Sequence, residues 1–229
     1  MQGELERALG TITGEAVRIV LAGRTDAGVH ATGQVISFRT CTRLDPATIR
    51  RGVNALLPQD IAIRDLGEVG EDFHARFSAT GRAYEYRIRC GAHREPLERH
   101  REHWVPQALD QGAMERATRT LVGRHDFAAF ATGPTMGRAE RDVRRAAWHR
   151  EGTLLRFGIE ANAFLRGMVR AIVGTLLWVG TGHIAPERVG EIMSGRDRSQ
   201  AGPNAPAAGL SLVEVRYDGQ ASETSDDDE

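Results

Sequence analysis

Residues 16–38 read AVRIVLAGRTDAGVHATGQVISF, two apolar runs on either side of a glycine-rich loop. In the first run Val17, Ile19 and Leu21 alternate with their neighbours, which predicts a strand with one buried face. The second run, residues 34–38, predicts another strand. The stretch therefore predicts strand, loop and strand, with one acidic residue, Asp26, near the middle of the loop.

The flanking sequence adds two helices and a third strand to this pair. Asp45 followed by Pro46 is typical of an N-cap and a first helical residue. Residues 2–9 place three apolar side chains on one side of a short helix. The elements expected in the first part of the chain are a helix at 2–9, strands at 16–22 and 34–38, a helix at 46–56, and a strand beginning at Ile61.

The remainder of the chain alternates between strand and helix patterns. Glu151-Gly152 lies between two strand-like runs and predicts a hairpin, and Asn162 is a possible N-cap for a long apolar helix. Strands are expected at 82–90, 143–149, 154–161 and 210–217, and helices at 110–121, 162–179 and 186–195. Strand pairs mixed with helices indicate an α+β fold with a largely antiparallel sheet.

Composition is that of an ordinary globular protein, with 41% hydrophobic and 27% charged residues among 229. Cys41 and Cys90 form no CxxC pair, so neither a disulfide framework nor a zinc site is indicated. The charged N-terminus does not resemble a signal peptide. The longest apolar stretch is broken by Arg166 and Arg170 and is not expected to span a membrane. We therefore expect a cytoplasmic protein that binds no metal.

The formal net charge of −1 conceals an uneven distribution. All 30 basic residues are arginines, and six of the acids lie in the last twelve residues. Residues 1–217 thus hold 30 basic and 25 acidic residues, a net charge of +5. This suits a polyanionic ligand, although absence of lysine alone can reflect genome composition. The segment 218–229 is expected to form a disordered acidic tail.

The loop at residues 23–31 contains the strongest candidate for a catalytic group. Asp26 lies between two glycines, which allow a tight turn and the close approach of a ligand. The adjacent Arg24 would favour the ionised carboxylate of a nucleophile or base. The alternative is an ordinary Asp-Ala-Gly turn in which Asp26 bonds its own backbone.

The sequence GRTDAGVHA at residues 23–31, followed by Gln34, Val35 and Phe38, resembles the signature of the TruA-type tRNA pseudouridine synthases. Further segments resemble the same family in the same order. They are NALLP at 54–58, FHARFSAT at 73–80, RAYEY at 82–86, NAF at 162–164, MVR at 168–170 and APAAGL at 205–210. The resemblance covers roughly residues 1–217, and several motifs in order carry more weight than one.

The resemblance implies the pseudouridine synthase fold. Two ferredoxin-like or RRM-like halves, residues 1–72 and 73–217, would share a largely antiparallel sheet around a central basic cleft. Family members begin with a strand that precedes the first helix, and this strand is missing here. We therefore expect a vacant slot between the strands near 34–38 and 61–66, and an unstable chain whose native start lies upstream.

The resemblance also implies the site residues. Asp26 would attack ribose C1′ or act through a glycal intermediate, with Arg170 as its ionic partner. Tyr84 would stack on the target base and could help to remove its C5 proton, and Arg24 would contact the RNA backbone or fill the gap where the nucleotide is flipped out. Residues expected to support the loop are Thr25, Gly28, His30 and Gln34. The substrate would be the tRNA anticodon arm, at positions 38, 39 and 40, bound by a homodimer without any cofactor.

Helical spacing supports Arg170 independently. Arg166 and Arg170 lie on or at the edge of an apolar stripe, where a part-buried guanidinium requires an acid. Arg166 is expected to extend to solvent instead. Tyr86 shares the strand face of Tyr84 and is expected to be a core residue.

Two other functions are compatible with parts of this pattern. A non-catalytic RNA-binding module would have the same fold but would not need Asp26. An aspartyl phosphohydrolase would need further acids for Mg²⁺, which the residues next to Asp26 do not supply. The GxGxxA match at residues 180–185 follows a helical pattern rather than a strand, and is expected to be a helix end.

Overall fold

The structure is a computed structural model that describes residues 1–135 and 139–218. The chain forms two compact units, one of residues 1–23 and 35–79 and the other of residues 24–34 and 80 onward. The predicted division after residue 72 stays a prediction, and the units are described separately. Most of the expected acidic tail, residues 219–229, lies outside the described residues. Within residues 1–135 and 139–218, no helix is long and apolar enough to cross a membrane.

The first unit packs two helices, α1 (Gln2–Thr13) and α2 (Pro46–Leu56), with a short antiparallel pair, β1 (Val20–Leu21) and β3 (Ile36–Ser37). The predicted cap of α2 is confirmed, since the Asp45 side chain accepts a hydrogen bond from the Thr48 amide at 2.9 Å. The apolar faces of both helices form the core together with Val17 and Ile19, which precede β1. Its buried residues are Leu5, Ala8, Leu9, Val17, Ile19, Ile49 and Val53.

The strands of this unit are shorter than predicted, and residues 61–66 form no strand. The prediction of a strand there was wrong for a physical reason. The Asn54 side chain donates to the Ile63 carbonyl at 2.8 Å and accepts from the Ile63 amide at 2.7 Å. An amide side chain thus binds the groups that a neighbouring strand would have bound. The vacant slot between strands stays a prediction.

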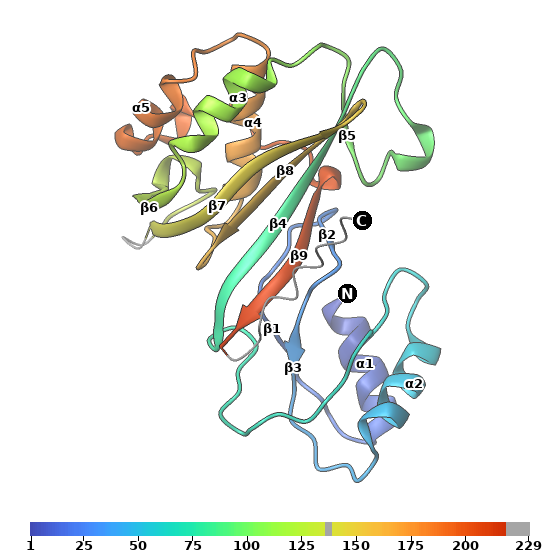
Figure 1. Ribbon diagram of the computed structural model, residues 1–229. Helices are drawn as coiled ribbons and strands as arrows, with labels where there is room; N and C mark the ends of the chain where they lie inside the picture. The colour runs from blue at the N-terminus through green and yellow to red at the C-terminus, as the bar shows by residue number, and fades with distance from the viewer. Residues whose placement is uncertain (136–138, 219–229) are drawn as a thin grey trace, which may run out of the picture. The chain divides into compact units, whose positions relative to one another are not determined.

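The second unit contains a seven-stranded sheet within the described residues, in the order β2-β9-β4-β8-β7-β6, with β5 beside β4 (Figure 1). Strand β2 is parallel to β9 and β5 is parallel to β4, whereas the ladder from β4 through β8 and β7 to β6 is antiparallel. The strands are β2 (His30–Ala31), β4 (Ala79–Cys90), β5 (His103–Val105), β6 (Gly123–Asp126), β7 (Glu140–Glu151), β8 (Leu154–Ala161) and β9 (Leu210–Tyr217). The predicted mostly antiparallel α+β architecture is confirmed at this level, and the two ferredoxin-like halves stay a prediction.

Three helices of this unit lie together on one side of its sheet in Figure 1. They are α3 (Gln111–Arg119), α4 (Met168–Gly180) and α5 (Arg188–Gly195). Alternate residues of the long strands, such as Tyr86 on β4 and Phe157 on β8, join Ile172 and Leu176 of α4 in one buried core. Short 3-10 turns complete the unit: η1 (Pro96–Glu98), η2 (Ala128–Phe130), η3 (Arg198–Gln200) and η4 (Ala207–Gly209).

The helix expected from Asn162 begins six residues later, so the predicted cap was wrong. The Asn162 side-chain oxygen instead accepts the amides of Ala163 at 2.8 Å and Asp142 at 3.0 Å, which ties the end of β8 to β7. Helix α4 starts after Gly167, whose φ of 70° is left-handed. At the other end α4 stops at Gly180 and Gly182 follows with φ 73°, which confirms that the GxGxxA match is a helix end.

Candidate active site

The loop that carries Asp26 is attached to the edge of the second unit's sheet. His30 and Ala31 form β2 and pair with Ser211 and Leu212 of β9. The next two amides, of Thr32 and Gly33, both donate to the Leu212 carbonyl, at 2.9 and 3.1 Å. A Cβ on Gly33 would lie 2.1 Å from the Val213 carbonyl oxygen, so only glycine fits this close approach. The end of the loop therefore has a fixed position on β9.

The loop itself turns tightly at Asp26. The Asp26 carbonyl accepts a hydrogen bond from the Val29 amide at 3.1 Å, and Gly28 has φ 81° at the third position of this turn. A positive φ there is typical of a type II turn and favours glycine. The Asp-Ala-Gly turn that the sequence suggested as an alternative to a catalytic loop is thus present in the backbone. The Asp26 side chain, however, has a different partner.

The Asp26 carboxylate forms the predicted ion pair with Arg170. Its Oδ2 lies 2.8 Å from Nη1 of Arg170, and the side chains are 35% and 20% exposed. Arg170 is held at a second point, since its Nε donates to the Ala205 carbonyl at 2.8 Å. The Ala205 amide in turn donates to the Arg170 carbonyl at 3.0 Å. The guanidinium is therefore fixed between a loop acid and a backbone carbonyl, in a half-buried environment where charge-assisted bonds are strong.

The segment that contains Ala205 is itself packed tightly against α4. A Cβ on Gly174 would lie 1.7 Å from the Pro203 carbonyl oxygen, which excludes any side chain at that helix position. The buried Thr175 hydroxyl accepts from the Gly202 amide at 2.9 Å. Tyr86, fully buried as predicted, donates its hydroxyl to the Pro206 carbonyl at 2.8 Å. These contacts hold the segment rigidly, and with it the Ala205 carbonyl that orients Arg170.

Tyr84 lies two residues before Tyr86 on β4 and is half-buried. Its ring meets that of Phe164 edge to face, with centroids 5.0 Å apart and planes at 83°. Burial raises the pKa of Tyr84; Arg82 lowers this pKa, and the charge of Asp26 raises it further. The charge of Asp26 thus acts on the phenol of Tyr84. At neutral pH the phenol is protonated, so it can donate a hydrogen bond but is not a phenolate base.

The other predicted site residues occupy the same loop. Arg24 is exposed and Thr25 is half-buried. His30 is exposed, and its Nε2 contacts the His100 carbonyl oxygen. Gln34 is half-buried at the end of the segment. Their roles in binding or support stay predictions.

Two contacts were not assigned from the sequence, although both residues lie in motifs that resemble the family. The first is the edge-to-face packing of Phe164 on Tyr84, and the second is the hydrogen bond from the Arg170 guanidinium to the Ala205 carbonyl. No local pattern could have revealed them, because each joins segments far apart in the chain.

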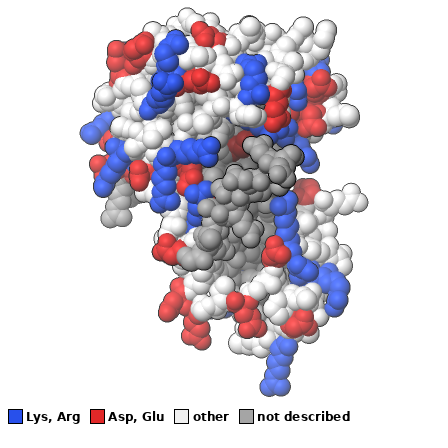
Figure 2. All heavy atoms as spheres, in the orientation of Figure 1, with Lys and Arg blue, Asp and Glu red and all other residues white. Residues whose placement is uncertain are grey.

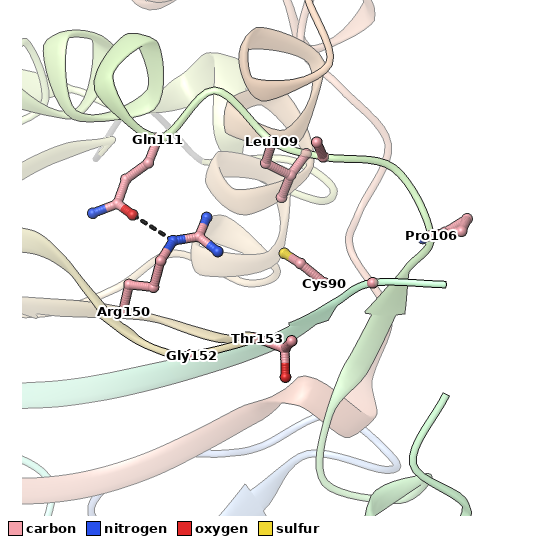
Figure 3. Close-up of a pocket in the computed structure, with 9 residues that line it drawn as sticks. Cys90, Pro106, Leu109, Gln111, Arg150, Gly152 and Thr153 are labelled. Carbon is pink, nitrogen blue, oxygen red and sulfur yellow. Dashed lines mark hydrogen bonds between the residues drawn. The ribbon is translucent and has the colours of Figure 1, made fainter. Parts of the chain in front are cut away.

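A separate hollow of about 570 Å³ lies at the turn between β7 and β8, and none of Asp26, Tyr84 and Arg170 lines it (Figure 3). Arg150 points into it, and its Nε donates to the Gln111 side-chain oxygen at 2.7 Å. Burial raises the pKa of the Cys90 thiol in its wall, so this sulfur is protonated at neutral pH and is a poor nucleophile. This hollow is therefore separate from the Asp26 loop and holds no activated thiol.

Charges of both signs alternate over the visible surface (Figure 2). Among the described residues, no group of three or more His, Cys, Asp or Glu side chains is placed to hold a metal ion.

Comparison with known proteins gives consistent matches. The family model described as tRNA pseudouridine synthase matches residues 1–78 and 117–218. The tRNA pseudouridine synthase A of Chloroflexus aurantiacus (strain J-10-fl) is 51% identical over 224 residues, covering 95% of this chain and 80% of the relative. The proteins of the same name from Roseiflexus sp. (strain RS-1) and Geobacillus kaustophilus (strain HTA426) are 46% and 42% identical. Both matches cover 95% of this chain. They cover 82% of the Roseiflexus protein and 85% of the Geobacillus protein.

Proposed function

Because the chain belongs to the tRNA pseudouridine synthase family, a family of isomerases, we propose that it converts uridine to pseudouridine in the tRNA anticodon stem and loop. The proposed targets are positions 38, 39 and 40. The observation that carries the proposal is the ion pair between Asp26 and Arg170, in which the acid lies on a tight glycine turn. The pair supplies an oriented carboxylate, and Tyr84 supplies an aromatic ring on which the target uracil can stack.

Asp26 is the proposed nucleophile. One carboxylate oxygen attacks ribose C1′, a C1′–O bond forms, and the bond from C1′ to uracil N1 breaks with its electron pair on the base. The freed uracil turns so that C5 faces C1′. A C5–C1′ bond then forms, the carboxylate leaves, and the proton on C5 is removed while N1 gains a proton. The atoms balance without any oxidant, metal or cofactor, and none is proposed.

Arg170 orients the nucleophile in this scheme. Nη1 binds Oδ2 of Asp26, so Oδ1 is the oxygen left for the attack on C1′. The guanidinium also offsets the cost of holding a carboxylate in a half-buried position. Because the Ala205 carbonyl holds Nε, the pair keeps its orientation when substrate enters. Such preorganisation contributes to the rate without any rearrangement during the reaction.

Tyr84 is the proposed stacking partner of the target uracil. A protonated phenol suits this role because it leaves the ring neutral and can donate a hydrogen bond. A uridine must leave its stack before a side chain can reach C1′, and Arg24, exposed two residues before Asp26, is proposed to contact the RNA at that point. Thr25, Gly28, His30 and Gln34 are proposed to support the loop.

The proposal extends to the assembly. We propose a homodimer that binds the anticodon arm in the cytoplasm, on the strength of the resemblance and of the net charge of +5 over residues 1–217. Arginine contacts with phosphate release counterions, so binding should weaken steeply as salt is raised.

One experiment tests the function directly. The full chain is incubated with an unmodified tRNA transcript in the presence of EDTA, and pseudouridine is mapped by carbodiimide modification and primer extension. Pseudouridine at positions 38, 39 or 40 is the expected result, and Asp26→Asn should give none. Binding of tRNA without any product would favour the alternative, a non-catalytic RNA-binding module of this fold.

A further inference from the structure

The connection between β8 and α4, residues 162–167, carries one aromatic side chain, Phe164, to which the proposed reaction gives no role. Its ring contacts Tyr84, the proposed stacking partner of the uracil. We infer that Phe164 is a positioning residue that fixes the ring of Tyr84 in the orientation required for the isomerisation. The inference rests on the proposed function.

The geometry of the contact is that of a specific aromatic pair. The two ring centroids lie 5.0 Å apart and the planes meet at 83°, so the edge of one ring faces the other's π surface. This arrangement is favoured by the ring quadrupoles over loose apolar contact. A tyrosine on a strand can rotate about two side-chain bonds, and such a neighbour restricts both. The Tyr84 ring is therefore held ready before any uracil arrives.

Phe164 can restrain Tyr84 only if its own backbone is rigid, and several hydrogen bonds make it so. The Asn162 side-chain oxygen accepts the amides of Ala163 and Asp142, so the residue before Phe164 is fixed to β7. The Arg166 carbonyl accepts from the Thr132 amide at 2.7 Å, which fixes the connection beyond Phe164.

The last residue of the connection is equally constrained. Gly167 has φ 70°, and a Cβ there would lie 2.3 Å from the Thr132 hydroxyl oxygen. Both ends of residues 162–167 are therefore held by contacts to other segments of the same unit.

The same connection leads directly to the other half of the site. Helix α4 begins immediately after Gly167, and Arg170 is its third residue. The connection and the first turn of α4, residues 162–170, thus supply both the ring that contacts Tyr84 and the guanidinium that binds Asp26. An enzyme that must hold a base and a nucleophile in register gains from fixing both through one segment.

The competing explanation is that Phe164 only fills space at the border of the core. It is half-buried and packs against the core cluster, and so does its neighbour Leu165. The two explanations differ in what they require of the side chain. Packing needs apolar volume, whereas positioning Tyr84 needs a ring at this place. Leu165 therefore provides a matched control on the same connection.

The test uses the full chain with Phe164→Leu, Phe164→Tyr and Leu165→Ala. Thermal unfolding measures the general loss of packing for each variant. Filter binding measures the Kd for an unmodified tRNA transcript, and single-turnover assays with excess enzyme measure the rate of pseudouridine formation. The chain has three tyrosines, so incorporated 3-fluorotyrosine gives three ¹⁹F signals, and Tyr84→Phe assigns one of them to residue 84.

Phe164→Leu should lower the single-turnover rate about tenfold, equivalent to about 1.4 kcal/mol, while the Kd for tRNA stays within about twofold. Its Tyr84 ¹⁹F signal should move or broaden. Phe164→Tyr adds a fourth tyrosine and so a fourth ¹⁹F signal, and it should retain both the wild-type rate and the wild-type signal of Tyr84. Leu165→Ala should lower the melting temperature without a comparable loss of rate.

Three outcomes would overturn the inference. An active wild-type enzyme whose rate is unchanged by Phe164→Leu removes the role of Phe164 while the proposed function stands. Equal losses of rate in Phe164→Leu and Leu165→Ala would reduce Phe164 to packing. A wild-type chain that binds tRNA but forms no pseudouridine defeats the proposed function, and the inference with it.

Discussion

Replacing Arg170 by methionine removes the guanidinium of the Asp26 ion pair but keeps an unbranched side chain of similar reach. Two interactions are lost, the 2.8 Å contact from Nη1 to Oδ2 of Asp26 and the 2.8 Å hydrogen bond from Nε to the Ala205 carbonyl. Arg170→Lys retains the positive charge, but one ammonium cannot reproduce the two-sided fork of the guanidinium. Comparison of the two variants separates the charge from the geometry.

The exposure of the two partners sets the magnitude. Exposed ion pairs contribute about 0–1 kcal/mol to stability, and breaking a fully buried pair costs about 3–5 kcal/mol. Asp26 is 35% exposed and Arg170 is 20% exposed, so this pair lies between the two limits. We expect Arg170→Met to lower the free energy of unfolding by about 2 kcal/mol. Arg170→Lys should lower it by about 1 kcal/mol, the typical net value of one hydrogen bond.

The assay is urea unfolding followed by circular dichroism, combined with single-turnover formation of pseudouridine. If the pair orients the nucleophile, a loss of about 2 kcal/mol in the transition state lowers the rate about 30-fold for Arg170→Met. Arg166→Met is the matched control, because Arg166 precedes the same helix and is exposed. It should change stability by less than about 0.5 kcal/mol and leave the rate within about twofold.

The reasoning would be refuted by Arg170→Met showing wild-type stability and rate. It would also fail if Arg166→Met reproduced the losses of Arg170→Met, since those losses would then reflect positive charge in general. A double variant with Asp26→Asn adds a further check. In that background Arg170→Met should cost measurably less stability, because the acid that the arginine binds is already neutral.

Four further outcomes are expected. Asp26→Asn should abolish pseudouridine formation while the Kd for tRNA, measured by filter binding, changes little, and comparable turnover would exclude it as the nucleophile. Tyr84→Phe should retain base stacking and lose only the hydrogen bond that the hydroxyl can donate, which should lower the single-turnover rate at similar affinity for tRNA. A wild-type rate would show that the hydroxyl is dispensable. Gly167→Ala should lower the melting temperature, because residue 167 has φ 70° and a Cβ would collide with Thr132, and an unchanged transition would contradict this. Burial raises the pKa of Tyr86, so the stability this residue contributes is complete below about pH 10 and falls by about 1.4 kcal/mol per unit as pH rises toward the folded-state pKa. Alkaline unfolding should therefore be less steep for Tyr86→Phe, and equal slopes would contradict this.

Elements with strong local signals were predicted well from sequence. The cap formed by Asp45 and the proline after it fixed the start of α2, and the turn at Gly152 fixed the hairpin between β7 and β8. The final strand, residues 210–217, was predicted to the residue. Each of these signals acts over a few neighbouring residues, so the chain need not be folded for the pattern to be interpreted.

Elements that depend on distant partners were missed. Strand β2 exists because residues 30–31 pair with β9, about 180 residues later, and their own sequence carries no strand pattern. Asn162 was expected to cap a helix, but its side-chain oxygen accepts a hydrogen bond from the Asp142 backbone amide on the neighbouring strand. The same side-chain chemistry suits both tasks, and only the fold decides between them.

The site was predicted in the same uneven way. Glycines around Asp26 and the helical spacing of Arg170 made each residue a candidate, but 144 positions separate them. Their pairing followed from family resemblance, supported by the argument that a half-buried guanidinium needs an acid. The contacts of Phe164 and Ala205 had no such signal.

The late start of α4 changes what Arg170 does in the fold. A helix from Asn162 would have placed this arginine in its third turn, whereas in the structure it lies in the first turn after Gly167. The N-terminal end of a helix carries partial positive charge, and a cation there is unfavourable by about 0.3–1 kcal/mol. Arg170 therefore occupies a position that helix electrostatics disfavours, and an acid partner must offset the cost. Asp26 supplies that acid, so the arginine is better explained by orientation of a carboxylate than by stability of the helix.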